Sequence, residues 1–246
     1  MTPAPERRFR FVPAFSLERL AAALADEIAK RRDPFEPETV LVMNAAQRVW
    51  LQHFIAERNG VCANVNFLSP ENFFARLGKK PDEAAADAAV AGDALAWRIF
   101  RALGEADAAG SAVPEKFRFR FREDTEEDRM TLARMLADLF WRYQSFRPEM
   151  IEAWQRGADD DETAGAPRGD AEFLAEYARQ RRLWRALRLD DASVPALRAL
   201  DFIRGNDLPD DAALPRRLFV FAPTALPRTH FEMLLRLSER AEVFFY

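Results

Sequence analysis

The chain has almost none of the residues that form disulfides or bind transition metals. Its 246 residues include one cysteine, Cys62, and two histidines, His53 and His230, which lie far apart in the sequence. A single cysteine cannot close an internal disulfide, and these three residues have no Cys/His metal spacing. The sequence therefore favours a reducing, cytoplasmic setting, and it predicts no metal or other cofactor.

Long apolar runs are also missing. The N-terminus, MTPAPERRFRFVP, is not followed by the apolar stretch of a signal peptide. No segment approaches the run of about 18 uncharged apolar residues that a membrane-spanning helix needs. The formal net charge is −4, so the surface as a whole does not favour nucleic acid or anionic lipid, although a local basic groove would not show in this sum. We therefore expect no membrane partner.

Apolar runs alternate with helical patterns at both ends of the chain. Leu17, Leu24 and Ile28 recur with helical spacing, and Asn59-Gly60 ends a second helical pattern that includes Val49 among its inward residues. Short apolar runs predict strands at residues 9–13, 39–43, 63–67, 217–222 and 241–246. Strands that alternate with helices form parallel sheets, so the predicted fold class is α/β with a parallel sheet.

The middle of the chain has a different pattern. Segments rich in Ala, Arg and Asp have helical spacing there, and the two best run from Glu126 to Phe146 and from Ala171 to Leu187. Trp154 and Trp184 here, and Trp50 in the earlier α/β part, are predicted to anchor cores. The polar tract from Gly157 to Gly169 predicts a loop.

This change of pattern predicts two parts. We expect an α/β domain of residues 1–80 and 206–246, interrupted by an inserted all-helical subdomain of residues 81–205. The chain ends on the apolar run AEVFFY, which is unusual for a terminus and predicts that the chain is a fragment of a longer protein.

A phosphate-binding loop is absent from its expected place. The turn after the first predicted strand, Pro13 to Ser16, has neither the glycines nor the lysine that surround a nucleotide phosphate. The Gly78-Lys79 pair lacks the preceding glycine, and Lys80-Pro81 follows where a hydroxyl residue would hold magnesium. We therefore expect no ATP hydrolysis by this chain.

Other catalytic patterns are weak. Asp210-Asp211 is the only superficial magnesium candidate, and a solvated turn is the better interpretation because no Glu-x-Lys strand follows. The histidines stand in no nucleophile motif, which favours structural roles. The segment KFRFRFR, residues 116–122, interleaves cations with phenylalanines that could pair phosphates and stack bases. Acidic residues follow it at once, so a charge-balanced surface turn is the alternative.

Several separated segments resemble one known family. They are DPFEPETVLVMNAAQRVWLQ (33–52), GVCANVNFLSPENFF (60–74), ADLFWRYQSFRPEMIEAWQRG (137–157), the Leu183-Trp184 pair and LPRRLFVFAPTALP (214–227). In this order they resemble the N-terminal region of the RecC family, the gamma chain of exodeoxyribonuclease V in the RecBCD helicase-nuclease. The resemblance covers nearly the whole chain, whereas the full family protein is much longer.

The resemblance implies a fold and a role. The family is a degenerate superfamily 1 helicase whose domain 1A carries an inserted domain 1B and has lost the ATP motifs. The resemblance implies that the chain is a non-catalytic part of exodeoxyribonuclease V, which acts in double-strand-break repair and recombination. This part would bind the beta and alpha motor subunits and conduct single-stranded DNA to where a Chi signal is read. The alternative is a protein-interaction module that docks the motor subunits without touching DNA.

The resemblance also implies DNA-binding positions. They lie after the second strand and along the helix of the DLF…RP segment: Met43, Asn44, Ala45, Val49, Ser69, Ala75, Asp138, Leu139, Trp141 and Arg147. Asp138, Leu139 and Arg147 match the family pattern. The family has polar Gln and Thr around Met43 to Val49 and a tryptophan at the position of Ala75, so the Chi sequence does not follow from this chain.

Overall fold

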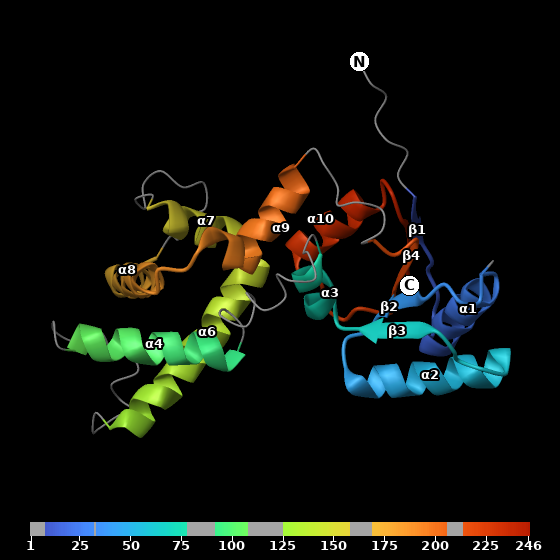
Figure 1. The fold of residues 1–246 in the computed structure, drawn as a ribbon, viewed down its shortest axis with the longest axis horizontal. Helices are drawn as coiled ribbons and strands as arrows, with labels where there is room; N and C mark the ends of the chain where they lie inside the picture. Colours follow the sequence, from blue (N-terminus) through green and yellow to red (C-terminus); the bar gives the residue numbers. More distant parts are fainter. Residues whose placement is uncertain (1–7, 32, 78–91, 108–124, 158–168, 206–213) are drawn as a thin grey trace, which may run out of the picture. The chain divides into compact units, whose positions relative to one another are not determined.

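The computed structural model describes residues 8–31, 33–77, 92–107, 125–157, 169–205 and 214–246, and the structural statements below concern these residues (Figure 1). The chain divides into two compact units. The first comprises Met1–Lys79 and Phe202–Tyr246, and the second comprises Lys80–Asp201. Each unit has its own hydrophobic core.

The first unit is built on a five-stranded sheet. Its strands are β1 (Phe9–Phe11), β2 (Glu38–Leu41), β3 (Val65–Leu68), β4 (Arg217–Val220) and β5 (Glu242–Phe245). They lie in the order β1-β5-β4-β2-β3, and every neighbouring pair is parallel. The predicted α/β class with a parallel sheet is therefore confirmed.

Helices cover both faces of this sheet (Figure 1). The helices are α1 (Leu17–Ala29), α2 (Ala45–Asn59), α3 (Pro70–Arg76) and α10 (Arg228–Leu237). Leu24 of α1 and Leu51 of α2 are buried against one sheet face, which includes Phe219. On the other face, Phe231 of α10 meets Phe245 edge to face at 6.1 Å. Successive side chains of a strand point to opposite faces, and burial on both sides explains the unbroken apolar runs.

The bounds of all five strands differ from the predicted ones by one or two residues, and three of these differences have local reasons. The third strand begins at Val65, because Asn64 has a left-handed backbone with φ of 55°. The fourth ends at Val220, and Ala222 is also left-handed, with φ of 40°. The first strand ends at Phe11, shortly before Pro13, which has no N–H for the ladder.

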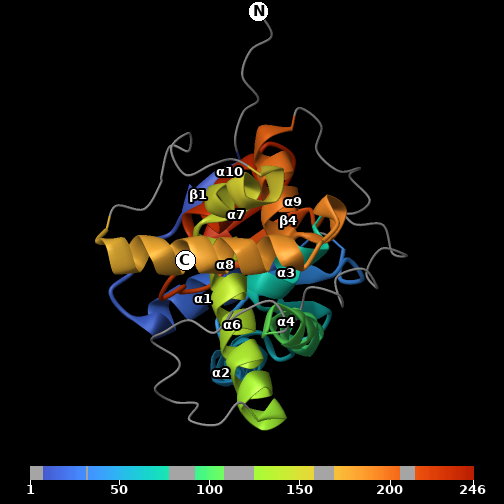
Figure 2. The same cartoon turned by 90° about the vertical axis from the view of Figure 1, so that its left-hand side faces the viewer.

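The second unit is helical in its described part. Its elements are α4 (Gly92–Asp107), α6 (Glu126–Phe146), α7 (Pro148–Arg156), α8 (Ala171–Ala186), the 3₁₀ turn η2 (Asp191–Ser193) and the start of α9 (Pro195–Arg204). The bounds predicted for α6 are confirmed, and α8 ends one residue before the predicted Leu187. Figure 2 shows α8 crosswise to α6.

Aromatic side chains form the centre of this helical unit. Trp154 and Trp184 are each 1% exposed, which confirms them as core anchors. The ring of Phe140 meets that of Trp184 edge to face at 5.4 Å. The indole N–H of Trp154 donates to the Tyr177 hydroxyl at 2.8 Å, and that of Trp184 donates to Gln155 Oε1 at 3.0 Å. Both buried indoles therefore have the partner that a buried N–H requires.

Candidate functional site

Four helices of the first unit, α1, α2, α3 and α10, begin at the carboxyl edge of the sheet, where ligands bind in open α/β folds. The N-cap of α10, Pro227, makes no side-chain hydrogen bond. Each of the other three has an N-cap side chain that accepts the N–H of the third helical residue. The accepting oxygens are those of Ser16 (3.3 Å), Asn44 (2.8 Å) and Ser69 (3.2 Å). The chain's own side chains therefore satisfy an amide that an anion could otherwise bind.

The turn between β1 and α1 does not have the geometry of a phosphate loop. In the described part of the chain, left-handed residues are confined to Gly60, Asn64, Gly157, Arg188 and Ala222. Residues 12–16 therefore contain no left-handed position, and Pro13 has no N–H to offer. Phe15 projects fully into solvent at this turn.

The start of α2 holds four of the predicted DNA-binding residues. Met43 is half-buried, and its backbone N–H donates to Gln47 Oε1 at 2.7 Å. Asn44 and Ala45 are exposed. Val49 is 46% exposed, so its predicted inward position is wrong. It precedes the buried Leu51 by two residues, which places it about 200° away around the helix.

Two further predicted residues lie on the next helix. Ser69 is the half-buried N-cap of α3, and Ala75 lies in that helix near its end. The remaining four belong to the second unit, so the predicted set is divided between the two units.

The α6 residues of the predicted set point in different directions. Arg134, Asp138 and Arg142 follow each other at four-residue spacing and form an exposed stripe. Trp141 is half-buried beside it, three residues after Asp138. Leu139 instead packs against the helical core. The exposed stripe thus carries two cations and one carboxylate, with a half-buried indole beside it.

Arg147 occupies the corner between α6 and α7. Its backbone N–H donates to Tyr143 O at 2.8 Å and closes α6, while its carbonyl accepts the Met150 N–H at 3.1 Å and opens α7. Pro148 follows as the first residue of α7, where its missing N–H costs nothing. The Arg147 side chain is exposed and has no hydrogen-bond or ion-pair partner among the described residues.

A cavity of about 410 Å³ lies beside this corner, and Arg147 lines it. The Tyr143 hydroxyl donates to Gln180 Oε1 at 2.9 Å, and Gln180 Nε2 donates to Glu176 Oε1 at 2.8 Å. Burial raises the pKa of the Tyr143 hydroxyl, an effect that the nearby Arg147 charge partly offsets. Phe173, 48% exposed, adds an aromatic face. Asp170, Glu172 and Glu176 also line the cavity, so its wall carries three carboxylates and one cation. Arg147 can pair an anion, Phe173 can stack a flat ring, and the carboxylates can accept hydrogen bonds.

The sequence did not predict this cavity. Phe173 and Tyr177 lie four residues apart on α8, a spacing that places them on one helix face and was visible in the sequence. Their position beside Arg147 depends on how α8 packs, which no local pattern reports. The candidate segments 116–122, 209–211 and 78–81 lie outside the described residues.

The described segments contain neither a metal-binding cluster nor a membrane-spanning helix. No group of three or more His, Cys, Asp or Glu residues there could hold a metal ion. No described helix is long and apolar enough to cross a membrane.

Comparison with known proteins gives the family. The family model described as the RecC N-terminal domain matches residues 9–246. The RecBCD enzyme subunit RecC of Mycolicibacterium smegmatis is 32% identical over 227 residues, which cover 89% of this chain and 19% of that protein. The same subunit of Haemophilus influenzae is 27% identical, covering 86% of this chain and 20% of that protein.

A third relative agrees with these two. The RecBCD enzyme subunit RecC of Escherichia coli K12 is 27% identical over 240 residues, which cover 90% of this chain and 20% of that protein. The two-unit structure with its parallel sheet is thus that of a RecC-type N-terminal region. The chain belongs to the RecC N-terminal domain family. It spans about one fifth of the length of the relatives it matches.

Proposed function

We propose that this chain is a non-catalytic, DNA-handling and scaffolding part of a RecBCD-type exodeoxyribonuclease V. Its single-stranded DNA contacts lie on α6 and at the α6–α7 corner. The observation that carries this proposal is the exposed Arg147 guanidinium, which has no partner among the described residues and borders the 410 Å³ cavity.

The corner suits a single strand for electrostatic and geometric reasons. Arg147 caps the C-terminus of α6, where the helix dipole favours a cation, and it is also the N-cap of α7, whose dipole opposes that effect. The guanidinium fork matches a phosphate, and the exposed Phe173 ring offers a stacking surface for a base. Asp138 on the α6 stripe can accept hydrogen bonds from base amino groups, which is the kind of contact that reading a Chi-like signal needs.

The same proposal assigns no ATPase to this chain. In the proposed assignment, residues 1–80 and 206–246 form a helicase-like 1A domain and residues 81–205 form the inserted 1B domain. The β1–α1 turn offers no glycine, no lysine and no left-handed residue for a nucleotide phosphate. ATP hydrolysis would then come from the beta and alpha motor subunits, which are the proposed protein partners in the cytoplasm.

A second function, docking of the motor subunits without DNA contact, has one observation in its favour. Phe11, Phe15 and Leu17 are 66%, 102% and 41% exposed within one short segment around the β1–α1 turn. Apolar side chains gathered on a surface are typical of protein-protein contacts. Because this segment is far along the chain from Arg147, variants can separate the two functions.

Single-strand binding by charge-removing variants tests the proposal. We expect Arg147→Gln to weaken binding of the 246-residue chain to an oligonucleotide. The salt slope, which is the steepness with which the logarithm of the binding constant falls with the logarithm of the salt concentration, should decrease by about 0.7, the value for one phosphate contact. Asp138→Asn should instead change the preference among oligonucleotide sequences, because a base contact contributes about 1–3 kcal/mol. Fluorescence anisotropy at several salt concentrations measures both effects.

The matched control is Arg101→Gln, which removes an exposed cation from α4 in the same unit. Its affinity and salt slope should equal those of the wild type. If Arg147→Gln and Asp138→Asn also behave like the wild type, the DNA assignment is wrong and docking becomes the better function.

A further inference from the structure

A second cavity, of about 330 Å³, lies at the amino edge of the sheet, opposite the helix starts described above. Glu38, Arg217 and Glu242, which begin β2, β4 and β5, line it. Its cationic lining residues are Arg8, Lys30, Arg31, Arg216, Arg217 and Arg240. Three carboxylates, those of Glu36, Glu38 and Glu242, also line it. Cations therefore exceed carboxylates in its wall, although the whole chain is negatively charged.

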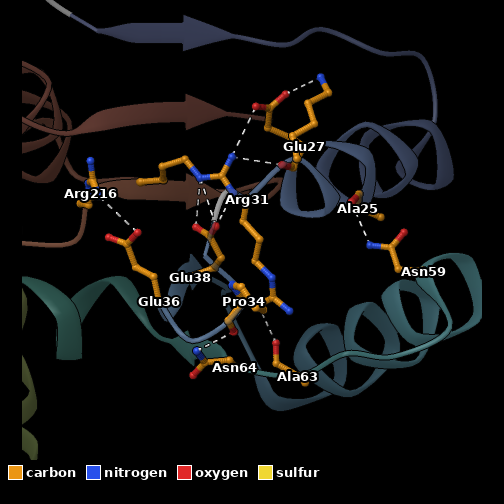
Figure 3. Close-up of polar contacts among 12 residues, drawn as sticks. Ala25, Glu27, Arg31, Pro34, Glu36, Glu38, Asn59, Ala63, Asn64 and Arg216 are labelled. Carbon is orange, nitrogen blue, oxygen red and sulfur yellow. Dashed lines mark hydrogen bonds and ion pairs between the residues drawn. The ribbon is translucent and has the colours of Figure 1, made fainter.

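One ion pair, between Arg217 and Glu38, lies in the wall of this cavity, and Figure 3 labels Glu38. Arg217 Nε donates to both carboxylate oxygens of Glu38, at 3.1 and 3.2 Å, and its Nη1 donates to Glu27 O at 3.1 Å. The two side chains are 16% and 6% exposed. Arg217 Nη1 also lies 3.5 Å from Glu27 Oε1, so two carboxylates neutralise this buried guanidinium. Arg217 therefore shapes the cavity rather than supplying its free charge.

Other cations keep their charge available. Arg31 Nη1 donates to the backbone carbonyl of Ala63 at 3.0 Å, which orients the guanidinium without neutralising it (Figure 3). Arg8 has no side-chain partner among the described residues. Arg216 is 81% exposed and reaches Glu36 only at 3.5 Å, a contact that contributes little in water.

The lining indicates which anion fits. Guanidinium groups bind phosphate through paired N–H donors. A cluster of arginines therefore favours phosphate over an anion that accepts a single hydrogen bond. Of the described residues that line the cavity, Pro37 alone has an apolar side chain. A peptide partner would need apolar or aromatic anchors, and base readout would need a stacking face or hydrogen-bonding amides.

We propose that this amino-edge cavity binds the phosphodiester backbone of nucleic acid independently of its base sequence. Arg31, Arg216 and Arg8 make the phosphate contacts, and the Arg217–Glu38 pair holds the wall. The site lies in the first unit and shares no residue with the α6–α7 corner.

An oligonucleotide of abasic deoxyribose phosphates tests this site, because it offers phosphates and no bases. The experiment uses the 246-residue chain with Arg147→Gln, so that a contact at the α6–α7 corner does not contribute. Adding Arg31→Gln and Arg216→Gln should weaken binding about tenfold at low salt and lower the salt slope by about 1.4, which is two phosphate contacts. Arg8→Gln, which breaks no described contact, should lower the slope by about half as much.

Arg19→Gln is the matched control, because it removes an exposed cation of α1 that does not line the cavity. It should leave affinity and slope unchanged, and all variants should keep the wild-type unfolding midpoint. The proposal is overturned if the cavity variants bind the abasic strand as the Arg147→Gln parent does, or if the parent shows no binding at low salt. It is equally overturned if the cavity variants lose affinity for a poly-glutamate peptide and keep their affinity for the abasic strand. None of these outcomes affects the separate test with Arg147 and base-bearing DNA.

Discussion

Truncating Trp154 to alanine should lower the free energy of unfolding of the helical unit by about 3–5 kcal/mol, the range for large aromatic residues removed from a core. Trp154 is 1% exposed and meets Phe140, Tyr143 and Tyr177 edge to face at 6.2, 5.9 and 5.3 Å. The substitution opens a cavity between α6, α7 and α8 and removes the donor to the Tyr177 hydroxyl. Urea denaturation followed by circular dichroism measures the loss.

Trp97 provides the matched control for this substitution. It lies on α4 in the same unit, and its side chain is 60% exposed. Trp97→Ala should change the free energy of unfolding by less than about 1 kcal/mol, because surface substitutions rarely cost more. Equal losses for the two tryptophans would show that the helical core described here does not form.

Acidification between pH 6.5 and 4 should destabilise the first unit through His230. Its imidazole is 7% exposed and stacks on Phe74 at 4.4 Å, and its Nδ1 is buried with no hydrogen-bond partner in the described structure. Burial lowers the pKa of His230 from 6.5 to about 4, although the charge of Glu71 acts in the opposite direction. Between these two values the unfolded chain binds a proton that the folded chain does not.

The sign of the effect follows from this difference in protonation. The stability that neutral His230 contributes is complete above pH 6.5 and falls as the pH drops toward 4, by up to about 3 kcal/mol. His230→Phe keeps a ring against Phe74 and removes the titrating group. The free energy of unfolding of this variant should therefore fall less than that of the wild type over this interval.

The exposed His53 on α2 gives the control. Urea denaturation at a series of pH values should give His53→Gln the same profile as the wild type. If the wild-type and His230→Phe curves run parallel from pH 7 to 4, the buried neutral histidine is not a determinant of acid stability.

Much of the fold could be predicted from the sequence, because burial on both sides of a parallel sheet leaves a local signal. All five strands occur where apolar runs predicted them, and α6 ends at Phe146 as its pattern indicated. The errors are local as well. β3 begins later than predicted because Asn64 has a left-handed backbone. Val49 is apolar yet faces solvent, so the hydrophobicity of Val49 alone predicted the wrong orientation.

The candidate sites were less predictable, because each joins segments far apart in the chain. The cavity beside Arg147 depends on Tyr143 and Gln180, which are 37 residues apart and meet through one hydrogen bond. The amino-edge cavity joins Arg31 to Arg216 through the strand order, which places β4 beside β2. Periodicity reports which residues share an element, and it does not report which elements are neighbours.

Photochemical cross-linking to single-stranded DNA tests the central claim most directly. A single strand containing 5-iododeoxyuridine is bound to the 246-residue chain, irradiated, and its attachment points are mapped by mass spectrometry. The proposal predicts attachment within α6 at Trp141, or to Tyr143, Phe173 or Tyr177 around the cavity, and a loss of this signal in Arg147→Gln. Cross-links confined to Phe11 and Phe15, unaffected by Arg147→Gln, would contradict it.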